Sequence, residues 1–424
     1  MTLQALRGTS DILEDDARRW AALERAVRRT AALYGYREIR TPVIEDAALF
    51  LRSIGETTDI IQKEMFRFQD RGGHEIVLRP EGTAPVIRAC LEHHLQNAQS
   101  LVRLFYLGPM FRAERPQAGR FRQFHQFGAE AIGSDSPWID VEMIRLCMHL
   151  LEACGAKSLC VWVASMGTRE DQRRSADALR SRLAPHRDGL CRDCRSRMDN
   201  NVFRVLDCRE PGCRKLAWAG AATPFLLCQE SAEHFDAVRR GLELAGVPFD
   251  DSKTFARGLD YYTRTVFEVR ASGLGAQDAV AAGGRYDHLT EELGGPRLGA
   301  VGFAAGIERV LLAAGEPAEE PAPRRGVYLA VARPAQLEAA ARLAHELRRQ
   351  GIGVIMDYEN RSLKSQLRDA DKRRCRVVAI VGDEELRKGV ITVRDLEDAR
   401  QEEINVHTLA EALASRLPKG CAHG

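Results

Sequence analysis

Apolar and polar positions recur with two different periods along this chain, and the periods predict its elements. Between Asp15 and Tyr34 the apolar residues are spaced three and four positions apart, which predicts an amphipathic helix that ends at Gly35. The same spacing predicts a helix over residues 140–155. Short runs rich in β-branched and aromatic residues predict strands, which cover residues 36–40, 74–80, 101–107 and 159–163.

The stretch from Gly108 to Glu130 reads GPMFRAERPQAGRFRQFHQFGAE, and the rest of the chain is organised around it. It turns at Pro116 and Gly119 and then alternates with period two, which predicts a β-hairpin with a long basic loop. The two strands would direct one set of side chains into a common space. This set consists of Arg112, Glu114, Arg120, Phe124, Gln126 and Glu130.

These side chains have the chemistry of a nucleotide site next to a cation site. Guanidinium groups form paired hydrogen bonds with phosphate oxygens, and an aromatic ring stacks on a base. Gln126 and Glu130 supply oxygens for a small polar cation. A solvated hairpin held by salt bridges is the alternative for any single run of charges, so this interpretation depends on the rest of the chain.

Other stretches place candidate binding residues at the ends of predicted elements. Glu81 lies between the strand at 74–80 and a helix that starts near Thr83, where it either faces an open pocket or caps the helix. Residues 256–269 (ARGLDYYTRTVFEV) alternate as a strand and set two adjacent tyrosines beside Arg257. Residues 281–289 (AAGGRYDHL) contain a Gly-Gly pair that would let the backbone approach a ligand.

The last part of the chain has the pattern of a separate domain. Residues 299–314 predict a strand, a glycine turn and a helix with Arg309 off its apolar face, and residues 315–325 are a Pro- and Glu-rich linker. Strands at 326–332, 353–358, 377–382 and 391–396 then alternate with helices at 337–350 and from Ser362. This alternation predicts an α/β domain. Its basic cluster at Lys372, Arg373, Arg374 and Arg376 is either a binding patch or a solvated helix end.

Composition limits the classes that the chain can belong to. Its 424 residues predict roughly two or three domains, and 45% hydrophobic with 29% charged residues is typical of a globular protein. The net charge of +2 means that any nucleic-acid surface must be a local patch. No apolar run has the length of a membrane span, and the N-terminus lacks an apolar signal core. The 11 scattered cysteines are typical of a reduced, cytoplasmic protein.

One segment differs from the rest in charge and in cysteine spacing. Residues 169–215 hold 13 Lys and Arg and 8 Asp and Glu, a local net charge of 13 − 8 = +5. Four cysteines occur there in two pairs, Cys191 with Cys194 and Cys208 with Cys213. Four thiolates can form a tetrahedral Zn²⁺ site, although the second pair has a wider gap than usual. Reduced thiols in a small helical insertion are the alternative, and the sequence favours neither.

The hairpin wording FRAERPQAGRFRQFHQFGAE resembles the second motif of class II aminoacyl-tRNA synthetases, and specifically that of histidyl-tRNA synthetases. Residues 256–269 and 281–289 resemble the two histidine-specific motifs of that family, and Arg309 matches the arginine of the third class II motif. The helix and strand at 15–40 resemble the first motif, which builds a dimer interface. The resemblance extends from Gly8 into the C-terminal domain.

The resemblance implies an α/β protein with an α+β catalytic core, in which helices flank an antiparallel sheet. It places the core at residues 1–165 and 218–314, an insertion at 166–217, a linker at 315–325 and an anticodon-binding domain at 326–424. It also implies a homodimer that activates L-histidine with ATP and Mg²⁺, then transfers histidine to the 3′ end of tRNA(His).

The family's roles carry over to matching positions of this sequence. Arg257 and Arg112 would be the catalytic cations. Histidine would be bound by Glu81, Thr83, Arg112, Gln126, Glu130, Arg257, Tyr261, Tyr262 and Tyr286, and ATP by Arg112, Glu114, Arg120, Phe124 and Arg309. Gln117 and Arg122 would contact the acceptor end of the tRNA.

Two non-catalytic classes are the alternatives. A histidine-sensing regulatory subunit of ATP phosphoribosyltransferase keeps the fold but generally lacks the anticodon domain and the ATP arginines, which are both present here. A sensor of uncharged tRNA would need a kinase domain, and this sequence has none.

Overall fold

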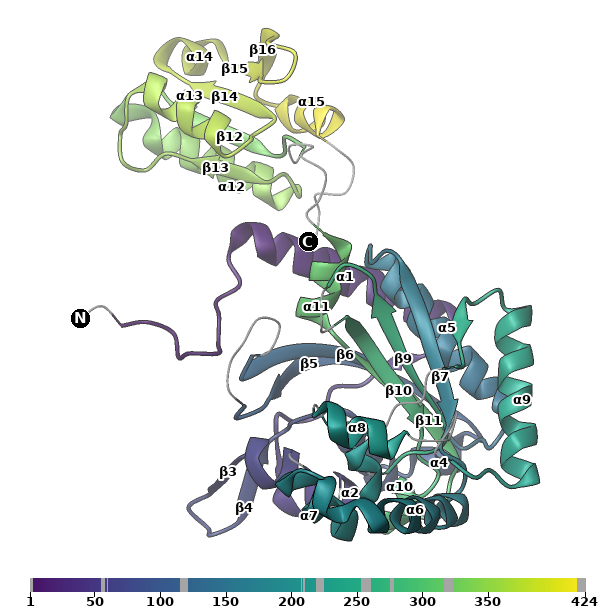
Figure 1. Ribbon diagram of the computed structural model, residues 1–424. Coiled ribbons are helices and arrows are strands. Elements are labelled where there is room, and N and C mark those ends of the chain that lie inside the picture. The colour runs from purple at the N-terminus through teal and green to yellow at the C-terminus, as the bar shows by residue number, and fades with distance from the viewer. Residues whose placement is uncertain are drawn as a thin grey trace. The chain divides into compact units, whose positions relative to one another are not determined.

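The computed structural model of the chain describes residues 3–54, 58, 60–114, 121–206, 208, 210–218, 225–252, 261–274, 278–315 and 323–417. The chain divides into two compact units, Met1–Glu316 and Pro317–Gly424, each built around a sheet of its own (Figure 1). Within these described ranges, no helix is long and apolar enough to cross a membrane.

An eight-stranded sheet forms the centre of the first unit. Its strands are β1 (Arg37–Glu38), β5 (Val102–Phe111), β6 (Gln123–Ile132), β7 (Leu159–Ser165), β8 (Phe249–Asp250), β9 (Thr263–Ala271), β10 (Ala279–Arg285) and β11 (Ala300–Gly306). They are hydrogen-bonded in the order β1-β5-β6-β11-β10-β9-β7-β8. Only the outer pairs β1–β5 and β7–β8 are parallel, so the predicted antiparallel class is confirmed.

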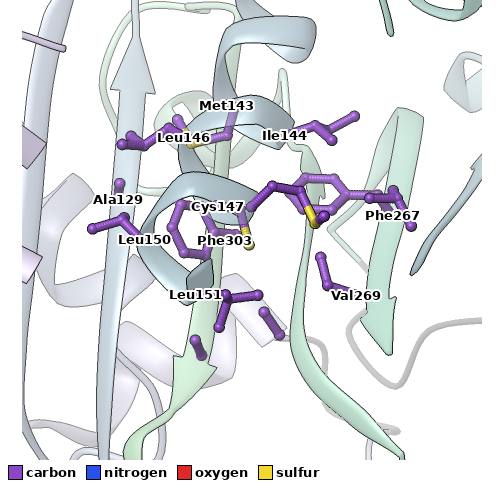
Figure 2. Packing of buried hydrophobic residues seen from close by; sticks show 14 of the residues in the cluster. Ala129, Met143, Ile144, Leu146, Cys147, Leu150, Leu151, Phe267, Val269 and Phe303 are labelled. Carbon is purple, nitrogen blue, oxygen red and sulfur yellow. The ribbon is translucent and has the colours of Figure 1, made fainter. Parts of the chain in front are cut away.

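Four helices share one core with this sheet: α1 (Glu14–Leu33), α5 (Pro137–Ala153), α9 (Gln229–Leu244) and α11 (Ile307–Ala314). The helix α5 starts where Ser136 accepts the backbone N–H of Trp138 at 3.3 Å, next to a proline that has no N–H to satisfy. Figure 2 shows its apolar side chains, among them Leu150, packed against Phe303 and Val269 of the sheet. Each such buried side chain contributes about 1.5–3 kcal/mol to the free energy of folding.

A second core involves the β6 side chains of opposite parity, since Ile132 lies in it and Phe124 packs against it. It includes Val86 and Ile87 of a helix, together with Tyr106 and Val266 of the sheet. Close by lies a small antiparallel sheet of order β2-β4-β3. The elements of this region are β2 (Ile44–Asp46), β3 (Phe66–Gln69), β4 (Glu75–Leu78), α2 (Ala47–Ile54), η1 (Ile60–Glu64), α3 (Thr83–Glu92), α4 (Leu95–Ala98) and α10 (Leu289–Glu292).

The insertion is a group of short helices with its own core. It consists of α6 (Arg169–Leu183), η2 (Ala184–Gly189), α7 (Arg192–Asn200), η3 (Val202–Val205) and α8 (Pro211–Ala217). A capping box starts α6, in which Thr168 Oγ1 accepts the N–H of Asp171 and the Asp171 carboxylate accepts the N–H of Thr168.

The second unit contains a five-stranded sheet of order β13-β12-β14-β15-β16, which is parallel from β13 to β14 and antiparallel beyond. Its strands are β12 (Val327–Val331), β13 (Val354–Met356), β14 (Val377–Val381), β15 (Val390–Asp395) and β16 (Gln401–Asn405). Its helices are η4 (Pro334–Gln336), α12 (Leu337–Arg349), α13 (Leu363–Lys372), α14 (Asp383–Lys388) and α15 (Leu409–Arg416). This is the predicted α/β unit.

Two strands begin later or end sooner than the pattern indicates. The run at 36–40 pairs with β5 only at Arg37 and Glu38. The strand expected over 256–269 begins at Thr263 in the described part of the chain, after both tyrosines. Arg264 has a φ of 48°, and the β9–β10 register shifts between Gly284 and Arg285. This irregularity breaks the alternation at the start of β9.

Candidate active site

The strand β6 separates two environments because its side chains alternate between the sheet faces. Phe127 and Ala129 point into the core beneath α5. His125, of the same parity, bonds to Glu308 of α11 through its backbone N–H at 2.9 Å and through Nδ1 at 3.0 Å. Gln126 and Glu130 belong to the other set, as the sequence predicts.

Glu130 is fully buried at the centre of this second set. Thr83 Oγ1 donates a hydrogen bond to its Oε1 at 2.7 Å, and the Tyr286 hydroxyl donates to its Oε2. Burial raises the pKa of Glu130 from 4.5 to about 8, against the two hydroxyl bonds that lower it and with a smaller upward contribution from Glu81. A buried acid of this kind has a strong preference for a cationic partner.

Glu81 lies near Glu130 and caps the first turn of the helix α3. Its carboxylate accepts the backbone N–H of Thr83 at 2.6 Å and of Ala84 at 2.9 Å. Burial raises the pKa of Glu81, while these N–H groups and the charge of Arg112 oppose the rise. The helix-capping alternative therefore describes its hydrogen bonds, and Glu81 brings a second carboxyl group near Glu130.

Aromatic rings pack near Glu130 on the side of β9 and β10. Tyr261 packs edge-on against Tyr262 and Tyr286, with ring centroids 4.8 and 5.7 Å apart. Tyr261 and Tyr262 precede the strand β9. Their side chains therefore lie together and do not point to opposite faces of a strand. Burial raises the pKa of Tyr261 and Tyr286 well above 10, so these hydroxyls remain neutral hydrogen-bonding groups.

The hairpin end of this group of residues carries an arginine and an unmatched polar atom. Arg112 lies 5.1 Å from the centre of the Phe124 ring and donates from Nε to Pro80 O at 3.1 Å. Gln126 Oε1 is buried and has no hydrogen-bond partner among the residues that the structure describes. A buried acceptor without a partner is rare in a native fold, so it marks a place for a ligand donor.

Of the remaining predicted site residues, some belong to the described part of the chain and others lie outside it. Arg122 precedes β6 and donates its backbone N–H to Gly8 O at 2.7 Å, and its Nε is 3.5 Å from Glu114 O. Arg309, on α11, donates to Ala279 O at 2.8 Å. Gln117, Arg120 and Arg257 lie outside the described residues.

The sequence pattern did not indicate several residues of this region. Gly302 pairs with Glu130 across β6 and β11, and a side chain there would overlap the Glu130 carboxylate. Tyr106 is buried in the second core, and its ring packs against Gly82. Arg79 donates from Nη1 to Thr41 O at 2.9 Å and from Nε to Pro109 O at 3.0 Å. The only signal for these residues is their place next to the motifs.

The four cysteines of the insertion come together in a cluster of their own. The Sγ atoms of Cys191, Cys194, Cys208 and Cys213 all lie within 4.8 Å of one another.

Comparison with known proteins gives the chain a family. The profile of the family described as histidyl-tRNA synthetase matches residues 8–177 and 227–310, and that of an anticodon binding domain matches residues 326–416. A curated histidine–tRNA ligase of Syntrophotalea carbinolica is 43% identical over 416 residues, which cover 98% of this chain and 99% of the relative. One from Desulfitobacterium hafniense is 44% identical over 420 residues, with coverage of 98% and 99%.

Solved structures agree with the sequence comparison. The apo histidyl-tRNA synthetase of S. aureus is 32% identical, with a TM-score of 0.80 over 97% of this chain and 99% of that one. The enzyme of Nostoc sp. PCC 7120, at 21% identity and a TM-score of 0.68, supports the fold alone. The resemblance of the sequence motifs is thereby confirmed, and the chain belongs to the histidyl-tRNA synthetase family.

Proposed function

We propose that this chain is a histidine–tRNA ligase. It activates L-histidine with ATP to give histidyl-adenylate and pyrophosphate, and then transfers the histidyl group to the 3′ end of tRNA(His). The observation that carries the proposal is the fully buried Glu130, held by Thr83 and Tyr286 beside a wall of tyrosines. An amino acid with an ammonium group and an aromatic ring matches both halves of this pocket.

The histidine ammonium binds Glu130 and the unmatched Oε1 of Gln126, with Glu81 and Thr83 at the same end. The imidazole lies among Tyr261, Tyr262 and Tyr286, and the neutral hydroxyls of Tyr261 and Tyr286 can pair with its ring nitrogens. The substrate carboxylate then faces Arg112 and Arg257.

ATP enters as its Mg²⁺ complex and occupies the hairpin end. Arg112, Glu114 and Arg120 hold the adenine and the folded triphosphate, while Phe124 and Arg309 stack on the base from its two sides. The histidine carboxylate attacks the α-phosphate and pyrophosphate leaves. Arg112 and Arg257 stabilise the charge that develops there, because phosphoryl-type transfer relies on positioning and electrostatics.

The tRNA is bound by more than one part of the chain. Gln117 and Arg122 contact its acceptor end, residues 166–217 form the insertion, and residues 326–424, after the linker at 315–325, bind the anticodon region. The core at 1–165 and 218–314 forms a homodimer, and the enzyme acts in the cytoplasm, where tRNA is charged. In the C-terminal basic cluster, Arg373 pairs with Asp369 at 3.1 Å and Arg376 with Asp395 at 3.0 Å, so both arginines have carboxylate partners within the domain.

The regulatory alternative receives less support. The matches to curated ligases cover 97–99% of this chain and of each relative. The anticodon-domain profile also matches residues 326–416, a domain that such regulatory subunits generally lack. The solved structure of an ATP phosphoribosyltransferase regulatory subunit/histidyl-tRNA synthetase from Bacillus halodurans is only 23% identical to this chain, so it supports the fold alone.

Exchange of labelled pyrophosphate into ATP by the purified chain tests the first step. Exchange is expected with histidine and not with phenylalanine or glutamine, because a site built for a polar ring rejects analogues that leave its buried groups unpaired. Histidine binding without any exchange would support the regulatory alternative instead.

A further inference from the structure

The cysteine cluster has the geometry of a metal cage. Cys191 lies just before α7, Cys194 within it, Cys208 after η3 and Cys213 within α8, yet their Sγ atoms all fall within 4.8 Å. The Sγ atoms of Cys191 and Cys208 are 3.9 Å apart. A tetrahedral zinc ion with Zn–S bonds of about 2.3 Å places its sulfur ligands about 3.8 Å from one another.

The arrangement differs from that of disulfides. A disulfide joins two sulfur atoms at about 2.05 Å, so four cysteines in disulfides would form two separate pairs. Here all four sulfurs converge on one point, and all four cysteines are free thiols. One ion at that point would satisfy all of them.

Backbone amides point at the sulfur atoms. Cys191 N donates to Cys213 Sγ at 3.2 Å, Cys194 N to Cys191 Sγ at 3.4 Å, and Glu210 N to Cys208 Sγ at 3.4 Å. Such N–H groups around metal-bound thiolates orient the ligands and stabilise their negative charge. The local net charge of 13 − 8 = +5 over residues 169–215 further offsets the charge of a four-thiolate zinc site.

The donor set and its burial indicate the kind of metal and its role. Only cysteines belong to this group within the part of the chain that the structure describes, and three of them are buried. Soft thiolates select zinc over Mg²⁺ or Ca²⁺. Four protein ligands leave no open position for a substrate, which is typical of structural sites.

The small size of the insertion favours a metal ion that stabilises its fold. Residues 184–217, which follow α6, form only short helices, and buried cysteines make up part of their small core with Leu179, Leu183 and Met198. Units below about 40 residues rarely bury enough apolar surface to hold their fold without a metal, a disulfide or a partner.

We propose that Cys191, Cys194, Cys208 and Cys213 bind one Zn²⁺ ion in a closed tetrahedral site that holds residues 184–217 together against α6. The ion is structural and takes no part in adenylate formation.

The metal content of the full-length chain, purified under reducing conditions without chelators, tests this assignment. Elemental analysis should find about one zinc ion per chain. Cys194→Ser and Cys213→Ser should each lose it. The matched control is Cys160→Ser on β7, a partly buried cysteine outside the cluster, which should keep it.

Cobalt titration of the wild-type chain keeps the proposal testable even if the cysteine variants misfold. After zinc removal under reductant, Co²⁺ should give the intense visible absorption of a tetrahedral thiolate site, and Zn²⁺ should abolish it. Protease cleavage within residues 184–217 should rise on metal removal and fall when zinc is restored. A reduced chain with no zinc and no cobalt spectrum would overturn the proposal. Neither readout needs ligase activity, so this proposal and the proposed function fail separately.

Discussion

Glu130 is the residue on which the proposed histidine site depends. It is fully buried, receives hydrogen bonds from Thr83 and Tyr286, and has a pKa raised to about 8 by burial. In the free protein near neutral pH its proton is therefore largely retained. A bound ammonium group would favour the ionised form, so we expect histidine binding to release a proton at this residue.

Replacing Glu130 with glutamine keeps the size of the side chain and removes its charge. A hydrogen bond to a charged group contributes about 1.5–3 kcal/mol, so Glu130→Gln should raise the histidine KM by about 10- to 100-fold. The ATP KM should change little, and steady-state exchange kinetics measure both. Glu114→Gln is the crossed control, because it should affect ATP more than histidine. If Glu130→Gln weakened ATP instead, the two halves of the pocket would be assigned the wrong way round.

The same residue predicts how stability depends on pH. A carboxyl whose pKa is higher in the folded protein than in the unfolded chain favours folding most at low pH, and this contribution is lost as the pH rises. For Glu130 the window runs from 4.5 to about 8. The melting temperature of Glu130→Gln minus that of the wild type should therefore grow across this window without histidine, and saturating histidine should reverse the trend by stabilising the wild type. A constant difference would mean that Glu130 is already ionised in the free protein.

At the scale of elements, the fit between β6 and β11 makes the site possible. Gly302 pairs with Glu130, and a side chain at this position would overlap the carboxylate. Gly302→Ala should therefore lower stability by about 1–3 kcal/mol, as overpacking does, and raise the histidine KM. Gly306→Ala on the same strand is the control, because its added Cβ meets no atom closer than 3.9 Å. Chemical denaturation measures the stability of both, and equal effects would argue against this packing.

The sequence predicts those elements whose period is carried by many residues. The helix expected over 15–34 is observed as Glu14–Leu33, and the hairpin alternation places Glu130 and Gln126 on the predicted face. The sequence did not predict the strands β2 and β3. Both are too short to show a period, and each pairs with β4. The start of β9 was misjudged because Arg264 adopts a left-handed φ that no residue pattern announces. Tyr106 and Gly302 escaped because their roles arise from contacts between strands.

At the scale of the whole molecule, the chain consists of two compact units. The second unit has its own sheet and apolar core, so it is expected to fold independently of the first. Removing residues 326–424 should leave a folded core that still performs histidine-dependent exchange but charges tRNA poorly. Circular dichroism checks the folding of the truncated chain. A folded, soluble core without exchange would contradict this division of labour.

The most direct test of the account is the charging of tRNA(His) with labelled histidine by the full-length purified chain. We expect ATP-dependent attachment of histidine to the 3′ end of this tRNA, no charging with phenylalanine, and a rate that falls sharply in Glu130→Gln at subsaturating histidine. A chain that binds histidine and ATP but transfers no histidine to tRNA(His) would contradict it.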